Sequence, residues 1–220
     1  MARLRVGVLI SGRGSNLQAL IAACTEPRFP AEIVLIISSH ASAPGLKLAE
    51  AAGISAAVLP HRERAAFAAA ADELLRAHRV ELVGLAGFMR VLAHGFVDAW
   101  RDRMVNIHPS LLPAFQGLHA QRQALAAGVR FSGCTVHFVR PELDCGPIIG
   151  QAVVAVYPED DEERLAARIL AVEHRLYPLA LRLIAEGRVR VVGDRVEIDG
   201  WQVPEVMALN PRDGRQDLLP

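Results

Sequence analysis

The sequence has few of the features that mark several large classes of protein. Only three cysteines occur among 220 residues, an odd number without C-x-x-C spacing, which argues against a disulfide framework and suits reduced thiols in a cytosol. Basic and acidic residues are balanced at 24 each, so no basic excess indicates a nucleic-acid partner. The sequence contains no run of about 18 consecutive apolar residues, so a membrane-spanning helix is not expected. We therefore expect a cytoplasmic protein without nucleic-acid or membrane partners.

The N-terminal apolar run is also too short for a signal peptide. Hydrophobic residues make up 52% of the chain, which suffices for one substantial core at this length. We expect a single domain over residues 1–200, with a nucleotide-binding half at about 1–100 and a catalytic half at about 101–200. Residues 201–220 are polar and proline-flanked in their last part and are predicted to be a tail.

Buried strand patterns alternate with helical patterns along the first half of the chain. The strands are predicted at 4–10, 32–39, 56–60 and 82–87, and the helices from about 17, at 44–52 and at 63–79. This order predicts an α/β fold with a doubly wound, mostly parallel sheet, Rossmann-like in its first half, helices on both faces and ligand sites at the strands' carboxyl ends. Within the helix at 63–79 the expected buried stripe is Ala66, Phe67, Ala70, Leu74 and Leu75.

The second half continues with a short helix at 93–103 and a fifth strand that starts at Met104. A brief helix, two strands, a long amphipathic helix and a hairpin are then predicted at 121–127, 131–139, 148–157, 161–187 and 188–200. Gly187 ends the long helix, and Gly193 with Asp194 forms the turn of the hairpin.

A glycine loop, Ser11-Gly12-Arg13-Gly14-Ser15-Asn16, connects the first strand to the first helix. It lacks the third glycine of a dinucleotide fingerprint and the Gly-Lys-Ser/Thr of a Walker loop. Two readings remain open. The loop binds a phosphate monoester through its backbone with Ser15 or Asn16, or it is a tight turn in which these residues cap the helix.

The fifth strand ends in Asn106-Ile107-His108-Pro109. In an extended strand the amide and the imidazole point to the same face, and Pro109 ends the strand just beyond them. A carboxylate, Asp144, lies in a glycine-proline loop between two later strands. If that loop meets the strand end, Asp144 favours the protonated form of His108, and Asn106 donates to an oxygen that gains charge. This set suits acyl transfer without a protein nucleophile.

Other readings of these segments rank lower. Cys134 and His137 are three positions apart in a strand, so they face opposite sides and are poor partners for a shared metal. Cys145 is a candidate thiol nucleophile, but no base is placed next to it by the sequence. Arg90 follows the fourth strand in an apolar segment, where a solvated arginine on a packed loop is the simplest interpretation.

The motifs together resemble the glycinamide ribonucleotide formyltransferase family over roughly residues 4–190. The matching segments are the glycine loop, Gly87-Phe88-Met89-Arg90-Val91-Leu92, Asn106-Ile107-His108-Pro109-Ser110-Leu111-Leu112-Pro113, Gly117-Leu118-His119 and Leu143-Asp144-x-Gly146-Pro147. The resemblance implies a formyltransferase fold and transfer of the formyl group of 10-formyltetrahydrofolate to the amine of glycinamide ribonucleotide. It implies no metal, and it leaves the oligomeric state open, with a homodimer as one alternative.

The resemblance also implies roles for individual residues. Asn106, His108 and Asp144 match the family's catalytic triad, while Gly14, Ser15, Asn16 and Glu173 match its contacts to the phosphate and ribose. The folate pocket is matched by Arg64, Met89, Arg90, Val91, Leu92, Arg140, Pro141, Glu142 and Leu143, with arginines meeting the carboxylates of the folate tail. Pro141 stands where an acidic residue is usual in the family, and it removes one backbone N–H from the pterin loop.

Three competing functions share parts of this pattern. A formyl-folate hydrolase of the same fold would use water in place of the amine, but it would carry an additional N-terminal domain before the first strand, which here begins at Leu4. A transfer-RNA formyltransferase would need a basic surface and a C-terminal domain, for which the residues after Gly187 are too few. A nucleotide-binding module without activity would keep the glycine loop but would not need to keep Asn106, His108 and Asp144 together.

Overall fold

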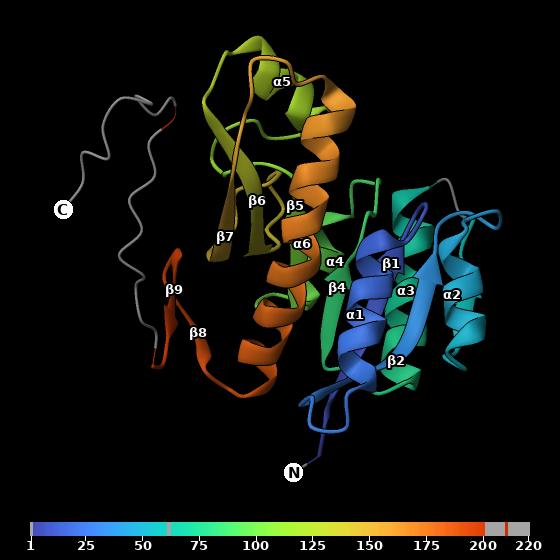
Figure 1. Cartoon of the computed structure of the whole chain (residues 1–220). Coiled ribbons are helices and arrows are strands. Elements are labelled where there is room, and N and C mark those ends of the chain that lie inside the picture. The colour runs from blue at the N-terminus through green and yellow to red at the C-terminus, as the bar shows by residue number, and fades with distance from the viewer. Residues whose placement is uncertain (1, 61–62, 201–209, 211–220) are drawn as a thin grey trace.

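The structure is a computed structural model and describes residues 2–60, 63–200 and 210. Seven strands form one sheet with helices against both faces, and a long helix, α6, runs across the middle of the molecule (Figure 1). No helix of the described part of the chain is both long and apolar enough to cross a membrane. The predicted α/β class and mostly parallel sheet are confirmed.

The first half follows the predicted alternation closely. Its elements are β1 (Leu4–Ile10), α1 (Ser15–Thr25), β2 (Ala31–Ser38), α2 (Gly45–Ala51), β3 (Ala56–Val58), α3 (Arg64–Ala77), β4 (Leu82–Leu85) and α4 (His94–Ala99). The second half contains β5 (Met104–His108), α5 (Ala120–Ala126), β6 (Phe131–Phe138), β7 (Ile148–Ala155), α6 (Glu162–Ala185), β8 (Val189–Val192) and β9 (Arg195–Ile198).

The strand order in the large sheet is β3-β2-β1-β4-β5-β6-β7, and β8 and β9 form a separate hairpin. Strands β1 to β5 are parallel, whereas β6 and β7 run antiparallel to their neighbours. The direction in which successive strands are added to the sheet reverses between β1 and β4. The loops that follow β1, β4 and β5 therefore lie at the same carboxyl edge of the sheet, where ligands bind in such folds. The glycine loop, the segment 87–92 and the end of β5 therefore lie at this edge, as the sequence predicts.

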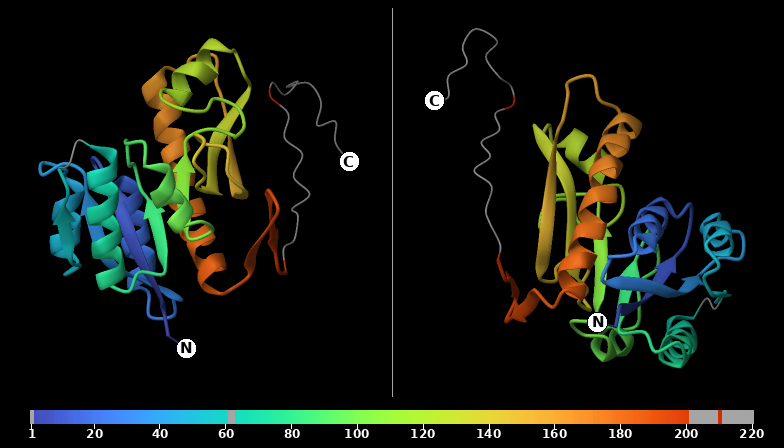
Figure 2. Two further views of the ribbon diagram at one scale, coloured as in Figure 1. Left: turned by 180° about the vertical axis from the view of Figure 1, so that it is seen from behind. Right: turned by 60° about the horizontal axis from the view of Figure 1, so that its bottom comes forward.

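The two faces of the sheet carry separate hydrophobic cores. Helices α1 and α6 pack on one face through residues such as Leu20 and Ile169, and α3 and α4 pack on the other through residues such as Phe67 and Phe96. The view from behind in Figure 2 shows α3 and α4 on the face opposite α1. A single sheet continues through both halves, which supports one domain, while the division at about residue 100 stays a prediction.

Tyr177 connects α6 to the two strands that carry the site. Its hydroxyl oxygen lies 3.0 Å from the carbonyl oxygen of Leu85 on β4 and 3.3 Å from that of Val105 on β5. A Cβ atom on Gly84 would lie 3.1 Å from this hydroxyl, so glycine lets the ring sit tightly against the sheet. Burial of the hydroxyl is tolerated because it has these acceptors.

The buried face of α3 differs from expectation. It consists of Phe67, Ala68, Ala71 and Leu75, whereas the expected Ala66 is exposed. Alanines occur all around this helix, so the sequence pattern located the buried face only to within about one position.

The predicted long helix is confirmed as α6. It continues through Pro178, which has no N–H to donate to the carbonyl group of the preceding turn.

Most of the predicted tail, residues 201–209 and 211–220, lies outside the described residues. Asn210 is described, and its side-chain amide donates to the carbonyl oxygens of Arg130 at 2.7 Å and Val156 at 3.1 Å. These two carbonyl groups flank the β6–β7 pair at its open end.

The packing of β6 against β7 yields a stability prediction at Gly133. A Cβ atom there would lie 1.9 Å from the carbonyl oxygen of Ala152, so Gly133→Ala must push the two strands apart. We expect a loss of about 1–3 kcal/mol or more in the free energy of unfolding, measured by urea denaturation. Gly95→Ala is the control, because no atom lies within 4 Å of its Cβ position and α4 should be stabilised by up to about 1 kcal/mol. Equal stability of the two variants would contradict this.

Candidate active site

Strand β5 presents Asn106 and His108 toward the same side of the sheet, as its period of two predicts. Asn106 is paired with Leu85 on the parallel neighbour β4 and with His137 on the antiparallel neighbour β6. His108 is the last residue of the strand and is buried. The strand end thus places an amide and an imidazole at the edge where the sheet changes from parallel to antiparallel.

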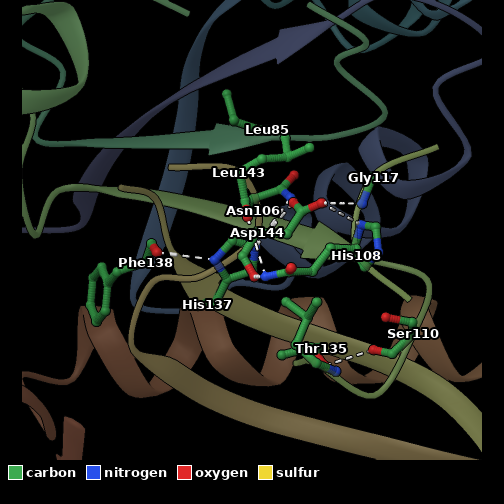
Figure 3. Close-up of polar contacts among 12 residues, drawn as sticks. Leu85, Asn106, His108, Ser110, Gly117, Thr135, His137, Phe138, Leu143 and Asp144 are labelled. Atoms are coloured by element: carbon green, nitrogen blue, oxygen red, sulfur yellow. Dashed lines mark hydrogen bonds and ion pairs between the residues drawn. The ribbon is translucent and has the colours of Figure 1, made fainter. Parts of the chain in front are cut away.

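The loop between β6 and β7 returns to this strand end and delivers Asp144. The Oδ2 atom of Asp144 lies 3.4 Å from Nδ1 of His108, and their side chains are 8% and 7% exposed. The backbone N–H of Gly117 donates to the same carboxylate oxygen at 2.9 Å. Figure 3 shows the carboxylate facing both groups. The predicted meeting of Asp144 and His108 is confirmed.

The ring of His108 faces two oxygen atoms. Its Nε2 atom lies 2.9 Å from the carbonyl oxygen of Phe115, and a carbonyl oxygen accepts only, so this nitrogen carries a proton. Its Nδ1 atom faces the Asp144 carboxylate. The ring is thus held between a backbone carbonyl oxygen and a carboxylate, which fixes its orientation at the end of β5.

His137 completes the site, although its place in the sequence indicates only a poor metal ligand. Its Nδ1 atom donates to the carbonyl oxygen of Phe138 at 3.0 Å, and its Nε2 atom lies 3.3 Å from Nδ2 of Asn106. Burial is the main cause that lowers the pKa of His137, and it outweighs the opposing effects of the Phe138 carbonyl group and Asp144. The neutral ring therefore accepts from Asn106, which leaves the second N–H of that amide for a ligand.

One signal in the sequence points to His137. It lies one residue before the end of β6, and a strand that returns antiparallel to β5 brings such a position next to Asn106. Because the sequence does not fix the pairing register, this signal becomes readable only in the structure.

The cysteines show no reactive environment. Burial raises the pKa of Cys134 to about 12, and Cys145 is exposed, with its pKa raised by partial burial and by the carboxylates of Glu142 and Asp144. A raised pKa disfavours the thiolate that a nucleophile requires. Across the described ranges, no group of three or more His, Cys, Asp or Glu side chains is arranged to hold a metal ion.

The glycine loop turns directly into α1. Gly14 adopts φ = 79° at the N-cap, and a Cβ atom there would lie 2.9 Å from the Cα atom of Gly45, so both the backbone angle and the space require glycine. Gly14 has no side chain with which to cap α1, and no side-chain cap occurs there. The first N–H groups of a helix have no partners within the helix, and they are suited to bind an anion.

Asn16 and Glu173, expected to contact phosphate and ribose, lie next to each other. The Nδ2 atom of Asn16 donates to Oε2 of Glu173 at 2.7 Å, and the two residues are 8% and 6% exposed. Burial raises the pKa of Glu173, and the hydrogen bond from Asn16 opposes this effect. Within the described chain, Oδ1 of Asn16 is buried without a hydrogen-bond partner. The Asn16 amide group is thus committed to Glu173, which leaves Ser15 and the backbone to face an anion.

The residues expected in a folate pocket, apart from the arginines, differ in exposure. Met89, Val91 and Leu143 are large apolar side chains exposed at 71%, 50% and 60%, as is usual for the lining of a binding surface. Leu92 is buried, and Pro141 and Glu142 belong to the same loop as Leu143.

The three arginines have different surroundings. Arg64 is exposed at the start of α3. The guanidinium group of Arg90 lies over the Phe67 ring at 4.7 Å, so this half-buried arginine packs on an aromatic side chain of α3. Arg140 is buried and donates to Asp102 at 2.6 Å. This ion pair connects the start of the Asp144 loop to the turn before β5, and the predicted contact of Arg140 with folate stays a prediction.

The segment that contains Met89 is also joined to the glycine loop. The Met89 N–H donates to the hydroxyl oxygen of Ser11 at 2.9 Å, and this hydroxyl group lies 2.9 Å from that of Ser39. Loops from β1, β2 and β4 are thus held together at the carboxyl edge of the sheet.

This arrangement is that of an α/β protein in which a glycine loop at a helix N-terminus and exposed apolar side chains lie at the same sheet edge as an amide, an imidazole and a carboxylate. Residues 4–181 match the model of the formyl transferase family. The chain belongs to the formyl transferase family.

Three similar proteins have names that refer to glycinamide ribonucleotide or to purine synthesis. The phosphoribosylglycinamide formyltransferase of Escherichia coli is 41% identical over 91% of this chain and 96% of its own length. The crystal structure of glycinamide ribonucleotide transformylase 1 from Symbiobacterium toebii is 52% identical, with a TM-score of 0.86 over 89% of this chain and 94% of that one. The trifunctional purine biosynthetic protein adenosine-3 of Bos taurus is 50% identical over 86% of this chain, which spans only 19% of that protein.

The burial of His137 predicts a pH effect on stability. Because its pKa in the folded protein is lowered from 6.5, the unfolded state binds more protons as the solution is acidified. The contribution of His137 is therefore complete above the unfolded pKa and is lost as the pH falls toward the folded one.

We expect the free energy of unfolding to decrease more between about pH 7 and pH 5 in the parent protein than in His137→Asn, measured by urea denaturation. The two curves should differ only below the ordinary histidine pKa. An identical decrease in both proteins would show that His137 is not held neutral by burial.

Proposed function

We propose that the protein transfers the formyl group of 10-formyltetrahydrofolate to the primary amine of glycinamide ribonucleotide, and that it releases N-formylglycinamide ribonucleotide and tetrahydrofolate in purine synthesis. The observation that carries this proposal is the buried His108–Asp144 pair next to Asn106 at the end of β5. Two relatives that match nearly end to end are a phosphoribosylglycinamide formyltransferase and a glycinamide ribonucleotide transformylase, which supports the choice of substrates.

The reaction needs a group that stabilises negative charge and a group that moves one proton. Attack of the amine on the formyl carbon makes a tetrahedral intermediate whose oxygen gains charge. The free N–H of Asn106 and the Nε2 proton of His108 are suited to bind this oxygen, and a comparable donor contributes about 2.7 to 4 kcal/mol. In this proposal the formyl oxygen takes the place that the Phe115 carbonyl oxygen now occupies at His108.

Proton movement completes the reaction. The attacking amine loses one proton, and the folate nitrogen that leaves the intermediate gains one, so one group that takes and gives a proton suffices. His108 and Asp144 together are placed for this role, because the carboxylate stabilises the imidazolium. The steps form no bond between substrate and protein and need no metal.

Two flanking surfaces hold the substrates in this proposal. The phosphate of the ribonucleotide binds the N-terminus of α1 through Gly14 and Ser15, and Glu173, held by Asn16, contacts the ribose. The folate lies against Met89, Val91, Leu92 and Leu143, next to Pro141 and Glu142, and Arg64 and Arg90 meet its carboxylates. Arg140 supports this surface from behind through Asp102.

The direct test is an assay with 10-formyltetrahydrofolate and glycinamide ribonucleotide in which release of tetrahydrofolate is followed. We expect release that depends on the ribonucleotide and a formylated product in equal amount. Release at the same rate without the ribonucleotide would indicate hydrolysis and contradict the proposal.

The roles of His108 and Asp144 predict large losses of turnover. His108→Ala removes the proton carrier, and Asp144→Asn keeps the shape of the side chain but removes its charge. We expect each variant to lower kcat by a factor of about 100 or more, while folate binding, measured by fluorescence titration, stays within a few-fold of the parent. Near-normal turnover in either variant would refute the assigned role.

The glycine loop predicts a selective loss of affinity. Ser15→Ala removes a hydroxyl donor near the α1 N-terminus, and a hydrogen bond to a charged group is worth about 1.5 kcal/mol or more, so we expect a roughly tenfold rise in the KM for the ribonucleotide. The KM for folate should not change. Thr25→Ala, at the far end of the same helix, is the control and should leave both values unchanged. An unchanged KM in Ser15→Ala would place the phosphate elsewhere.

A further inference from the structure

The two loops that form the site are tied together by one side chain, Gln116. Its Nε2 atom lies 3.0 Å from the carbonyl oxygen of Asp144 and 3.3 Å from that of Leu143. These residues are 28 and 27 positions away in the sequence. An amide nitrogen has two N–H groups, so Gln116 can donate to both carbonyl groups at once.

Gln116 stands in a run of three residues that each contact the His108–Asp144 pair or its loop. Phe115 accepts from the His108 ring through its carbonyl oxygen, and Gly117 donates its N–H to the Asp144 carboxylate. Figure 3 shows Gly117 beside the Asp144 carboxylate. The residues on both sides of Gln116 thus touch the pair itself, whereas Gln116 touches the backbone that carries it.

The backbone at Asp144 needs such support. Asp144 has φ = 51°, a left-handed backbone conformation that residues other than glycine adopt uncommonly. The two ends of its loop are fixed independently, by the ion pair between Arg140 and Asp102 at one end and by Gly146 at the other. A Cβ atom on Gly146 would lie 1.7 Å from the carbonyl oxygen of Phe138, so that end fits closely against β6.

Gln116 is itself held in place by α5. The side-chain amide of Gln123 donates to the carbonyl oxygens of Gln116 and Leu118, both at 3.0 Å. The hydrogen bonds therefore run from a helix to residues 116–118, and from there to the loop of Asp144. A rigid element supports the position of the carboxylate through an exposed side chain.

We infer that Gln116 is a positioning residue, whose amide group holds the backbone of Asp144 so that the carboxylate stays between the Gly117 N–H and the His108 ring. The consequence for rate rests on the proposed function, but the positioning itself does not. Gln116 contacts no reacting atom. Its loss should therefore lower kcat, by about tenfold, and should leave the KM for the ribonucleotide unchanged, because the glycine loop is untouched.

Three variants separate this role from general packing. Gln116→Met keeps the length of the side chain but cannot donate, and Gln116→Lys restores a donor to the two carbonyl groups. Gln121→Ala is the control. Gln121 lies in α5 and, in the described part of the chain, makes no hydrogen bond to either loop. We expect a loss of kcat in Gln116→Met, recovery of most of it in Gln116→Lys, and no change in Gln121→Ala.

The experiment has two readouts on the full-length protein. The first is amide hydrogen exchange of Gly117 by NMR without substrates. Exchange should become faster in Gln116→Met than in the parent and Gln116→Lys, because a displaced Asp144 no longer accepts from this N–H. The second is the pair of kcat and KM values from the tetrahydrofolate assay.

Parent-like exchange at Gly117 in Gln116→Met would overturn the inference, and so would an equal loss of kcat in the Met and Lys variants. Faster exchange in a protein that transfers no formyl group would instead support the positioning role and contradict the proposed function. The failure of one proposal is therefore distinguishable from the failure of the other.

Discussion

The antiparallel pairing of β5 with β6 is the constraint on which the site depends. Five parallel strands bring the glycine loop and the end of β5 to one edge of the sheet. Because β6 returns antiparallel, His137 comes to lie opposite Asn106, and the loop that follows leads Asp144 back to His108. Glycines at 133 and 146 allow the close approach of backbones that this return requires.

The two imidazoles of the site have different partners. His108 faces the carbonyl oxygen of Phe115 and the carboxylate of Asp144, whereas the buried ring of His137 faces the side-chain amide of Asn106. Burial lowers the pKa of His137, so its neutral ring accepts from Asn106. The buried ring thereby orients the amide that lies beside His108.

The helices and strands could be predicted from the sequence, whereas only some of the contacts between distant segments could. Asn106 and His108 followed from a period of two, and Asp144 from its loop, because these signals are local. The role of His137 was missed, since strand register is set by tertiary packing. The ion pair of Arg140 with Asp102 was missed for the same reason, and Ala66 was misplaced because alanine marks a helix face weakly. The roles of the substrate-binding residues stay predictions.

In the proposed reaction the formyl group meets the amine at the end of β5. A crystal structure with glycinamide ribonucleotide and a stable analogue of 10-formyltetrahydrofolate tests this meeting point most directly. We expect the carbonyl oxygen of the analogue to lie within hydrogen-bond distance of Asn106 Nδ2 and His108 Nε2, in place of the Phe115 carbonyl oxygen. A carbonyl group bound away from these two atoms, with the His108–Phe115 hydrogen bond intact, would contradict it.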